Sequence, residues 1–156
     1  MVEGVDDNLV RLLYFSRARP DRNVNDTQVL RQILEVSETQ NALRGITGCL
    51  LACNGRFMQI LEGPNSNVQT TYGSIARDVR HEDVRLVRVG AATERLFPQW
   101  TMCGRELSPT DDAVVDVLEN AGSFDPSRLT LDRSVSLLLR IQELQSKHGT
   151  GDVLLD

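Results

Sequence analysis

Two apolar runs separated by Asn54 and Gly55 form the clearest hydrophobic pattern in the chain, over residues 45–53 and 56–63. Asn-Gly tolerates the positive φ angles of a two-residue type I′ turn, so this pattern predicts a β-hairpin. A turn of that length also predicts the register of the two strands. The expected pairs are Cys53 with Arg56, Ala52 with Phe57, Leu50 with Gln59, and Gly48 with Leu61.

Gln59 is a polar exception on one face of this hairpin. Side chains alternate between the faces of a strand, so Gln59 shares its face with apolar residues: Leu50, Ala52, Phe57 and Leu61. A buried amide without a hydrogen-bond partner costs about 1–3 kcal/mol. We therefore expect Gln59 to meet another polar side chain, a water or a ligand on that face.

An apolar run over residues 9–16 has the length and composition of a central strand covered on both faces. Alternation divides its side chains between two faces, with Leu12, Tyr14 and Ser16 on one and Arg11, Leu13 and Phe15 on the other. Over residues 84–90, apolar positions alternate with Arg85 and Arg88, which predicts a partly exposed strand.

Helical periodicity appears between these strands. It predicts one helix over residues 26–41, which starts at a capping-box pattern. A second helix is expected to start within residues 64–67 and to end near Arg80 and His81. The stripe of the first helix places Asn41 in its last turn, on the side that faces the sheet.

This order of elements predicts an α+β fold, a ferredoxin-like βαββαβ arrangement with two helices on one sheet face. A fifth strand is expected over residues 99–106, with Trp100, Met102 and Gly104 on one of its faces. Two further helices, over residues 110–120 and 131–147, are expected to cover the other sheet face. Their apolar stripes contain Val114, Val117 and Leu118, and then Val135, Leu138, Leu139, Ile141 and Leu144.

The composition predicts one soluble domain in the cytoplasm. A chain of 156 residues can bury a core without disulfides, and its three cysteines show no CxxC spacing, which is typical of free thiols in a reducing compartment. No apolar run approaches a membrane span, and the N-terminus lacks the layout of a signal peptide. The net charge of −5 argues against direct binding to nucleic acid.

Common catalytic and metal-binding patterns are missing from the sequence. It has two histidines, His81 and His148, and no HExxH or paired CxxC, so a metal site is not expected. It also lacks the GxSxG, GxGxxG and GxxxxGK[ST] patterns of hydrolases, dinucleotide-binding folds and phosphate loops. We therefore do not expect an enzyme.

Polar residues on the predicted helix-facing surface suggest a ligand site instead. Tyr14 and Gln59 lie in strands that adjoin in a ferredoxin-like sheet, so the phenol and the amide can hydrogen-bond. Asn41 approaches from the first helix, and Arg80 and His81 can meet anionic groups. A planar heterocycle with a phosphate tail would fit between the two helices.

Five motifs bring these residues together in one order: LLYFS around Tyr14, QNALRGITGCL around Asn41, GRFMQILEGP around Gln59, RDVRH ending at His81, and FPQWTM with Trp100 and Met102. In sequence and spacing they resemble the BLUF family of blue-light sensors that use flavin. The resemblance implies a flavin-binding domain over residues 7–106, and a C-terminal helical extension over residues 107–150 that packs on the sheet. Gln40 is a departure, since other members have histidine or asparagine there.

The resemblance also implies a role for each matched residue. Tyr14 would donate an electron to photoexcited FAD, Gln59 would bridge Tyr14 to the flavin N5/O4 edge, and Asn41 would bind the carbonyl edge of the ring. Arg80 and His81 would lie near the ribityl and phosphate end. Light would leave Gln59 rotated, tautomerised or both, without consuming a substrate.

The output implied by the resemblance is a signal to another protein. Trp100 and Met102 match the positions of the fifth strand that shift with the signal. Short members of the family act through a separate effector protein, and their C-terminal helices often mediate oligomer contacts, so a homo-oligomer is expected.

All of these residues except Gln59, where leucine would suit a core better, also have a purely structural interpretation. Tyr14, Trp100 and Met102 would then be core residues, Asn41 a left-handed helix C-cap, and Arg80 with His81 a solvated helix end. Two other functions stay open at this point. One is an interaction module without a chromophore, and the other is an acylphosphatase-like enzyme with Arg17 and Arg19 at a phosphate loop.

Overall fold

The computed structural model describes residues 8–19, 26–53, 56–98, 103–107 and 130–148. Its elements follow the predicted order. They are β1 (Leu9–Ala18), α1 (Asp26–Arg44), β2 (Thr47–Cys53), β3 (Arg56–Pro64), α2 (Asn65–Ala76), β4 (His81–Ala91), β5 (Cys103–Leu107) and α4 (Leu131–His148). Among these helices, none combines the length and hydropathy that a membrane span requires.

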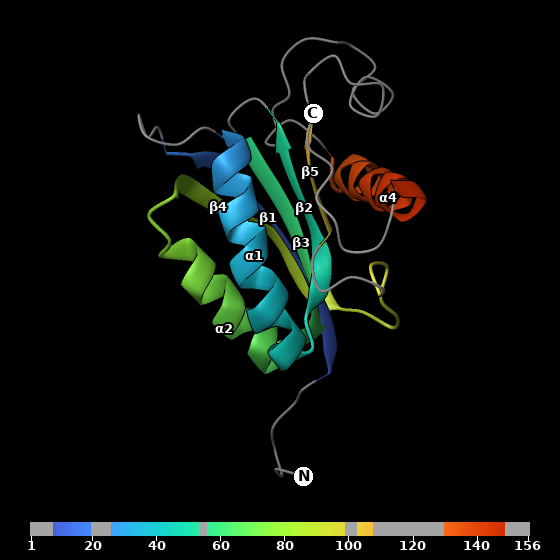
Figure 1. Cartoon of the computed structure of the whole chain (residues 1–156). Helices are drawn as coiled ribbons and strands as arrows, with labels where there is room; N and C mark the ends of the chain where they lie inside the picture. Colours follow the sequence, from blue (N-terminus) through green and yellow to red (C-terminus); the bar gives the residue numbers. More distant parts are fainter. Residues whose placement is uncertain (1–7, 20–25, 54–55, 99–102, 108–129, 149–156) are drawn as a thin grey trace.

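The strands form one sheet in the order β4-β1-β3-β2-β5. The first four strands pair antiparallel, and β5 joins parallel to β2 at one edge. Helices α1 and α2 lie on one face of the sheet and α4 lies on the other (Figure 1). This is the α+β, ferredoxin-like arrangement with a fifth strand that the sequence predicts. The helix expected over residues 110–120 lies outside the described residues.

Alternating side chains of the central strands build two separate hydrophobic cores. The core under α2 contains Leu12, Tyr14, Leu50, Phe57, Leu61 and Val68. The core under α4 contains Leu13, Leu51, Met58, Ile60, Phe97, Leu137 and Leu138. The division predicted for β1 is therefore confirmed, with Tyr14 on the α2 side and Leu13 on the α4 side.

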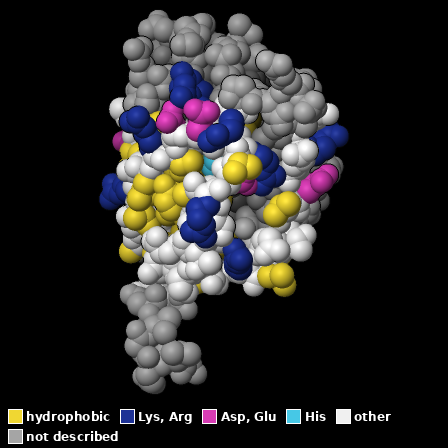
Figure 2. Space-filling model, turned by 90° about the vertical axis from the view of Figure 1, so that its left-hand side faces the viewer, with side chains coloured by type: hydrophobic (Ala, Val, Ile, Leu, Met, Phe, Trp, Pro, Cys, Tyr) yellow, Lys and Arg dark blue, Asp and Glu magenta, His cyan; other side chains and the backbone are white. Residues whose placement is uncertain are grey.

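The predicted hairpin register is confirmed at each of the four pairs named above. β4 is an edge strand and mostly exposed, as its alternation predicts. Its exposed apolar side chains are Leu86, Val87 and Val89. Figure 2 shows the face of the molecule that lies on the left in Figure 1, where hydrophobic side chains gather with Lys and Arg around them.

Helix α1 ends three residues later than predicted, at Arg44, and still places Asn41 in its last turn. Gly45 follows with φ of 65°, the left-handed conformation that glycine adopts without a steric cost. The left-handed C-cap is thus Gly45, and the C-cap interpretation of Asn41 is wrong. A Cβ at Gly63 would lie 2.9 Å from the Gly45 carbonyl oxygen, so this junction also needs glycine in β3.

Helix α2 ends at Ala76, not near Arg80 and His81 as predicted. Asp78 explains the earlier end, because its Oδ1 accepts the backbone N–H of Arg80 at 2.9 Å and closes a turn. Val79, which continues the helical period in the sequence, is 76% exposed in that turn. Arg80 therefore lies in the turn, and His81 is the first residue of β4.

Candidate functional site

Tyr14 and Gln59 face each other directly across β1 and β3. The Tyr14 hydroxyl donates a hydrogen bond to Gln59 Oε1 at 2.5 Å, and both side chains are buried. The prediction that the phenol and the amide are neighbours on one face is confirmed. With Oε1 accepting from the phenol, the amide nitrogen of Gln59 is the donor end of the pair.

The surroundings of Tyr14 favour its neutral form. Burial raises the pKa of the phenol far above its ordinary value, and the negative charges that Tyr72 and Asp78 can carry raise it further. The Tyr72 ring lies 5.6 Å from the Tyr14 ring, centroid to centroid. Tyr14 thus keeps its proton available for donation to Gln59.

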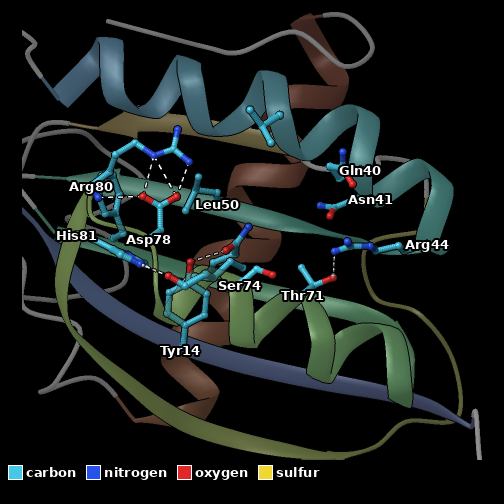
Figure 3. Close-up of a pocket in the computed structure, with 14 residues that line it drawn as sticks. Tyr14, Gln40, Asn41, Arg44, Leu50, Thr71, Ser74, Asp78, Arg80 and His81 are labelled. Atoms are coloured by element: carbon cyan, nitrogen blue, oxygen red, sulfur yellow. Dashed lines mark hydrogen bonds and ion pairs between the residues drawn. The ribbon is translucent and has the colours of Figure 1, made fainter.

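A cleft of about 750 Å³, including its open mouth, lies between α1 and α2 above this pair. Figure 3 shows side chains from both helices, the sheet and the turn before β4 around it. The lining residues are Tyr14, Val36, Gln40, Asn41, Arg44, Leu50, Phe57, Gln59, Thr71, Ser74, Ile75, Asp78, Arg80 and His81.

Asn41 places a buried amide in the cleft wall from the last turn of α1. Its backbone carbonyl accepts the N–H of Ile46 at 2.9 Å, which fixes the chain as it leaves the helix for β2. Gln40, where the sequence departs from the family pattern, is exposed at the cleft rim. Both neighbours on α1 therefore line the cleft.

Asp78 and Arg80 form a tight ion pair at one end of the cleft. Arg80 Nε donates to both carboxylate oxygens of Asp78, at 2.9 and 3.1 Å, and Nη2 contacts Oδ2. These hydrogen bonds hold the pKa of Asp78 below its ordinary value and raise the pKa of Arg80. The charge of Arg80 is thus largely compensated within the protein.

His81 is held by two hydrogen bonds of its own. Its Nε2 donates to the Ile75 carbonyl oxygen at 2.6 Å, so in the neutral ring Nδ1 accepts from the Ser16 hydroxyl at 2.8 Å. The ring joins the end of α2 to β1 and closes the cleft beside Tyr14. A role for Arg80 and His81 at an anionic group stays a prediction.

Sequence reasoning missed three contributors to this site: Asp78, Arg44 and Thr71. Asp78 lies inside the RDVRH motif, two residues before Arg80, but the helical period hid the turn that pairs them. Arg44 and Thr71 come from different helices, and their side chains meet across the cleft, with Arg44 Nη1 donating to Thr71 Oγ1 at 3.2 Å. No local pattern signals such a contact.

Trp100 and Met102 lie outside the described residues, and β5 is described from Cys103. Within the described part of the chain, no group of three or more His, Cys, Asp or Glu side chains could hold a metal ion.

Comparison with known proteins identifies relatives of this site. A family model described as BLUF, sensors of blue-light using FAD, matches residues 9–103. Photoactivated adenylate cyclase subunit beta of Euglena gracilis is 38% identical over 124 residues, which is 76% of this chain and 14% of that protein. The blue light- and temperature-regulated antirepressor BluF of Escherichia coli K12 is 32% identical over 144 residues, 91% of this chain and 34% of that protein.

Solved structures agree with these matches. BlsA in its photo-activated state has a TM-score of 0.76 and 27% identity, covering 86% of this chain and 94% of the other. BlrB, a BLUF protein in its dark state, has a TM-score of 0.68 and 30% identity, covering 87% and 96%. The chain thus spans nearly all of these small proteins, but about one seventh of the Euglena cyclase subunit.

Proposed function

The chain belongs to the BLUF family of blue-light sensors, and on that premise we propose that it holds FAD in the cleft between α1 and α2 and signals to a separate protein. The observation that carries this proposal is the Tyr14 to Gln59 hydrogen bond of 2.5 Å at the floor of the cleft. The cleft also combines apolar side chains, such as Leu50 and Phe57, with many polar groups, which suits a planar ring with polar edges.

Tyr14 and Gln59 are proposed as the photochemical pair. Bound flavin supplies a chromophore for blue light and, once excited, an electron acceptor. Tyr14 would give up an electron to the flavin, and the phenolic proton would pass along the short, buried hydrogen bond to Gln59, whose amide would pass a proton on to the flavin. When both return, Gln59 is left rotated, tautomerised or both. The amide suits this role because its two ends are a donor and an acceptor of similar shape.

The remaining site residues are proposed to hold the ring. Asn41 offers a buried amide to the flavin carbonyl edge from α1. Arg80 and His81 bound the opposite end together with Asp78. Because Arg80 is engaged by Asp78 and His81 by Ser16 and Ile75, these two residues serve mainly as a fixed end wall.

For the output, we propose a flavin-binding domain over residues 7–106 and a helical extension over residues 107–150. Trp100 and Met102 would pass the state of Gln59 to this extension, whose α4 packs against the sheet face opposite the cleft. The E. coli relative is an antirepressor and the Euglena relatives are cyclase subunits, so we propose a protein effector and no catalysis by this chain. A cytoplasmic homo-oligomer without contacts to nucleic acid or membrane completes the proposal.

Light-minus-dark absorption spectra test this function. We expect the purified protein to be yellow and blue light to shift the flavin band to longer wavelength. Gln59→Leu is expected to retain flavin and lose the shift, because leucine has no hydrogen bond to rearrange. Gln69→Leu, an equivalent change on the exposed face of α2, is the matched control and should keep the shift. A colourless wild-type protein, or a full shift in Gln59→Leu, would contradict the proposal.

A further inference from the structure

Arg95 does not line the cleft, but its guanidinium binds three oxygens around the end of α1. Nη2 donates to the Gly45 carbonyl oxygen at 2.8 Å, and Nη1 donates to Thr47 Oγ1 at 2.7 Å and to the Glu62 carbonyl oxygen at 3.1 Å. Gly45 follows α1, Thr47 begins β2 and Glu62 lies in β3. One half-buried side chain from the connection after β4 thus holds the junction between α1 and the sheet.

The peptide bond between Gly45 and Ile46 connects this guanidinium to Asn41. Its carbonyl oxygen accepts from Arg95 Nη2, and its N–H donates to the Asn41 carbonyl oxygen at 2.9 Å. Because a peptide unit is planar, the two hydrogen bonds fix the orientation of one rigid plane. Arg95 therefore restrains the last turn of α1, where Asn41 contributes to the cleft wall (Figure 3).

The backbone that carries Arg95 is itself fixed to the sheet. The buried carboxylate of Glu62 accepts the N–H groups of Leu96 and Phe97, at 2.9 and 2.7 Å. The guanidinium also suits its position, because the last carbonyl groups of a helix carry the negative end of the helix dipole. A cation with several N–H donors in a planar fork can bind more than one oxygen there.

We propose that Arg95 is a positioning residue of the flavin site, which holds the end of α1 so that the Asn41 amide meets the ring. This inference rests on the proposed function, in which Asn41 binds the carbonyl edge of the flavin. It adds a residue that acts on the ligand only through Asn41. With a purely structural role, loss of Arg95 would destabilise the fold but leave the FAD affinity of the folded protein unchanged.

Hydrogen exchange of the buried Ile46 amide, followed by NMR in the flavin-free protein, tests the restraint itself. We expect Arg95→Gln to speed this exchange by about 10-fold or more, because the peptide plane loses one of its two hydrogen bonds. Arg88→Gln removes the same charge from an exposed position of β4 and should change the rate by less than about 2-fold. An unchanged rate in Arg95→Gln would overturn the inference, whether or not the protein binds FAD.

A double-mutant cycle on FAD affinity, measured by calorimetric titration and corrected for the folded fraction, tests the link to Asn41. Asn41→Ala removes the amide but keeps the carbonyl that binds Ile46. We expect it to weaken FAD by about 10-fold, and Arg95→Gln by about 5-fold, since the second change displaces the amide without removing it. The double variant should then bind about as weakly as Asn41→Ala alone, whereas independent effects would multiply to about 50-fold.

Two further variants complete the test. Thr47→Val removes one oxygen bound by Nη1 and leaves the bond from Nη2 to Gly45, so it should retain the wild-type affinity. Arg95→Lys keeps the charge without the fork and should lie between wild type and Arg95→Gln. Independent effects in the cycle, or wild-type affinity in Arg95→Gln, would overturn the assignment of Arg95. Failure of wild type to bind FAD would instead overturn the proposed function.

Discussion

The fold prepares Tyr14 for the light-driven role that we propose for it. The phenol is buried in the core under α2, and its hydroxyl is fixed on Gln59 by a short hydrogen bond. Burial raises the pKa of this phenol, so the proton stays on the oxygen at any physiological pH. Because the phenol keeps its proton and already donates it to Gln59 Oε1, this proton can transfer soon after the phenol loses an electron.

The raised pKa of Tyr14 predicts a pH dependence of stability. The unfolded chain loses the phenolic proton above the ordinary value of 10.0, whereas the folded chain retains it. The contribution of Tyr14 to the free energy of unfolding is therefore fully present below pH 10 and is lost as the pH rises above that value. Between pH 9 and 11, we expect the free energy of unfolding of wild type to fall by about 1 kcal/mol more than that of Tyr14→Phe.

Urea unfolding of both proteins at pH 9 and pH 11 measures this difference. Tyr72→Phe is a suitable control, since Tyr72 is only partly buried and should contribute less than Tyr14. The same decline in wild type and Tyr14→Phe would contradict the expected burial of the phenol.

Between elements, Glu62 joins β3 to the connection that follows β4. Its buried carboxylate accepts hydrogen bonds from Arg11 Nε at 2.7 Å, from the Leu96 N–H at 2.9 Å and from the Phe97 N–H at 2.7 Å. Gln142 of α4 donates to the Leu96 carbonyl oxygen at 2.9 Å. Three residues beyond Gln59 in the same strand, Glu62 thus holds a segment that also touches α4.

Replacing this carboxylate should cost substantial stability. Glu62→Gln puts an amide N–H₂ among three N–H donors, so at least one of them loses its acceptor. We expect a loss of about 2–4 kcal/mol in the free energy of unfolding, measured in urea. Glu82→Gln is the matched control, because its pair with Arg17 spans 3.5 Å between partly exposed side chains and should contribute less than about 1 kcal/mol. Equal losses in the two variants would show that Glu62 does not have this role.

The sequence predicted those elements that depend on local residue patterns. It did not predict the end of a helix where a side-chain hydrogen bond decides that end. The period of two residues and the Asn-Gly turn sufficed for the hairpin register. Helix α2 was predicted too long because Val79 continues the helical period, while the Asp78 side chain closes the turn. The hydrogen bonds of Glu62 join residues more than 30 positions apart, which no local pattern reveals.

The molecule as a whole separates two tasks on the two faces of one sheet. The face under α1 and α2 lines the cleft, and the face under α4 packs a second apolar core. Figure 1 shows the helices on these two faces. Sequence alternation predicted this separation, since Tyr14 and Gln59 fall on one face and Leu13 and Met58 on the other. The ends of the cleft could not be predicted in the same way, because Arg44, Thr71 and Asp78 meet only through the packing of α1, α2 and the turn before β4.

Two neighbouring leucines of β2 test whether the faces act separately. Leu50 and Leu51 are both fully buried, but Leu50 lines the cleft and Leu51 belongs to the core under α4. Leu50→Ala and Leu51→Ala should each lower the free energy of unfolding by about 2–5 kcal/mol, because each leaves a cavity in a packed core. Their effects on flavin affinity should differ, since Leu50→Ala alone changes the wall of the cleft.

Urea unfolding of the flavin-free proteins and flavin titration at low temperature separate the two effects. We expect Leu50→Ala to weaken flavin binding by about 10-fold, because it removes one apolar contact with the ligand. Leu51→Ala should change the affinity of the folded protein for flavin by less than about 2-fold, after correction for the fraction of protein that is folded. Equal weakening in both variants would mean that α4 and the cleft share one cooperative core, because a cavity on either face would then loosen the same ligand site. Separate effects would instead mean that the signal we propose for Gln59 has to cross the sheet through the strands themselves or through the connections at their ends. The segment held by Glu62 is one such connection.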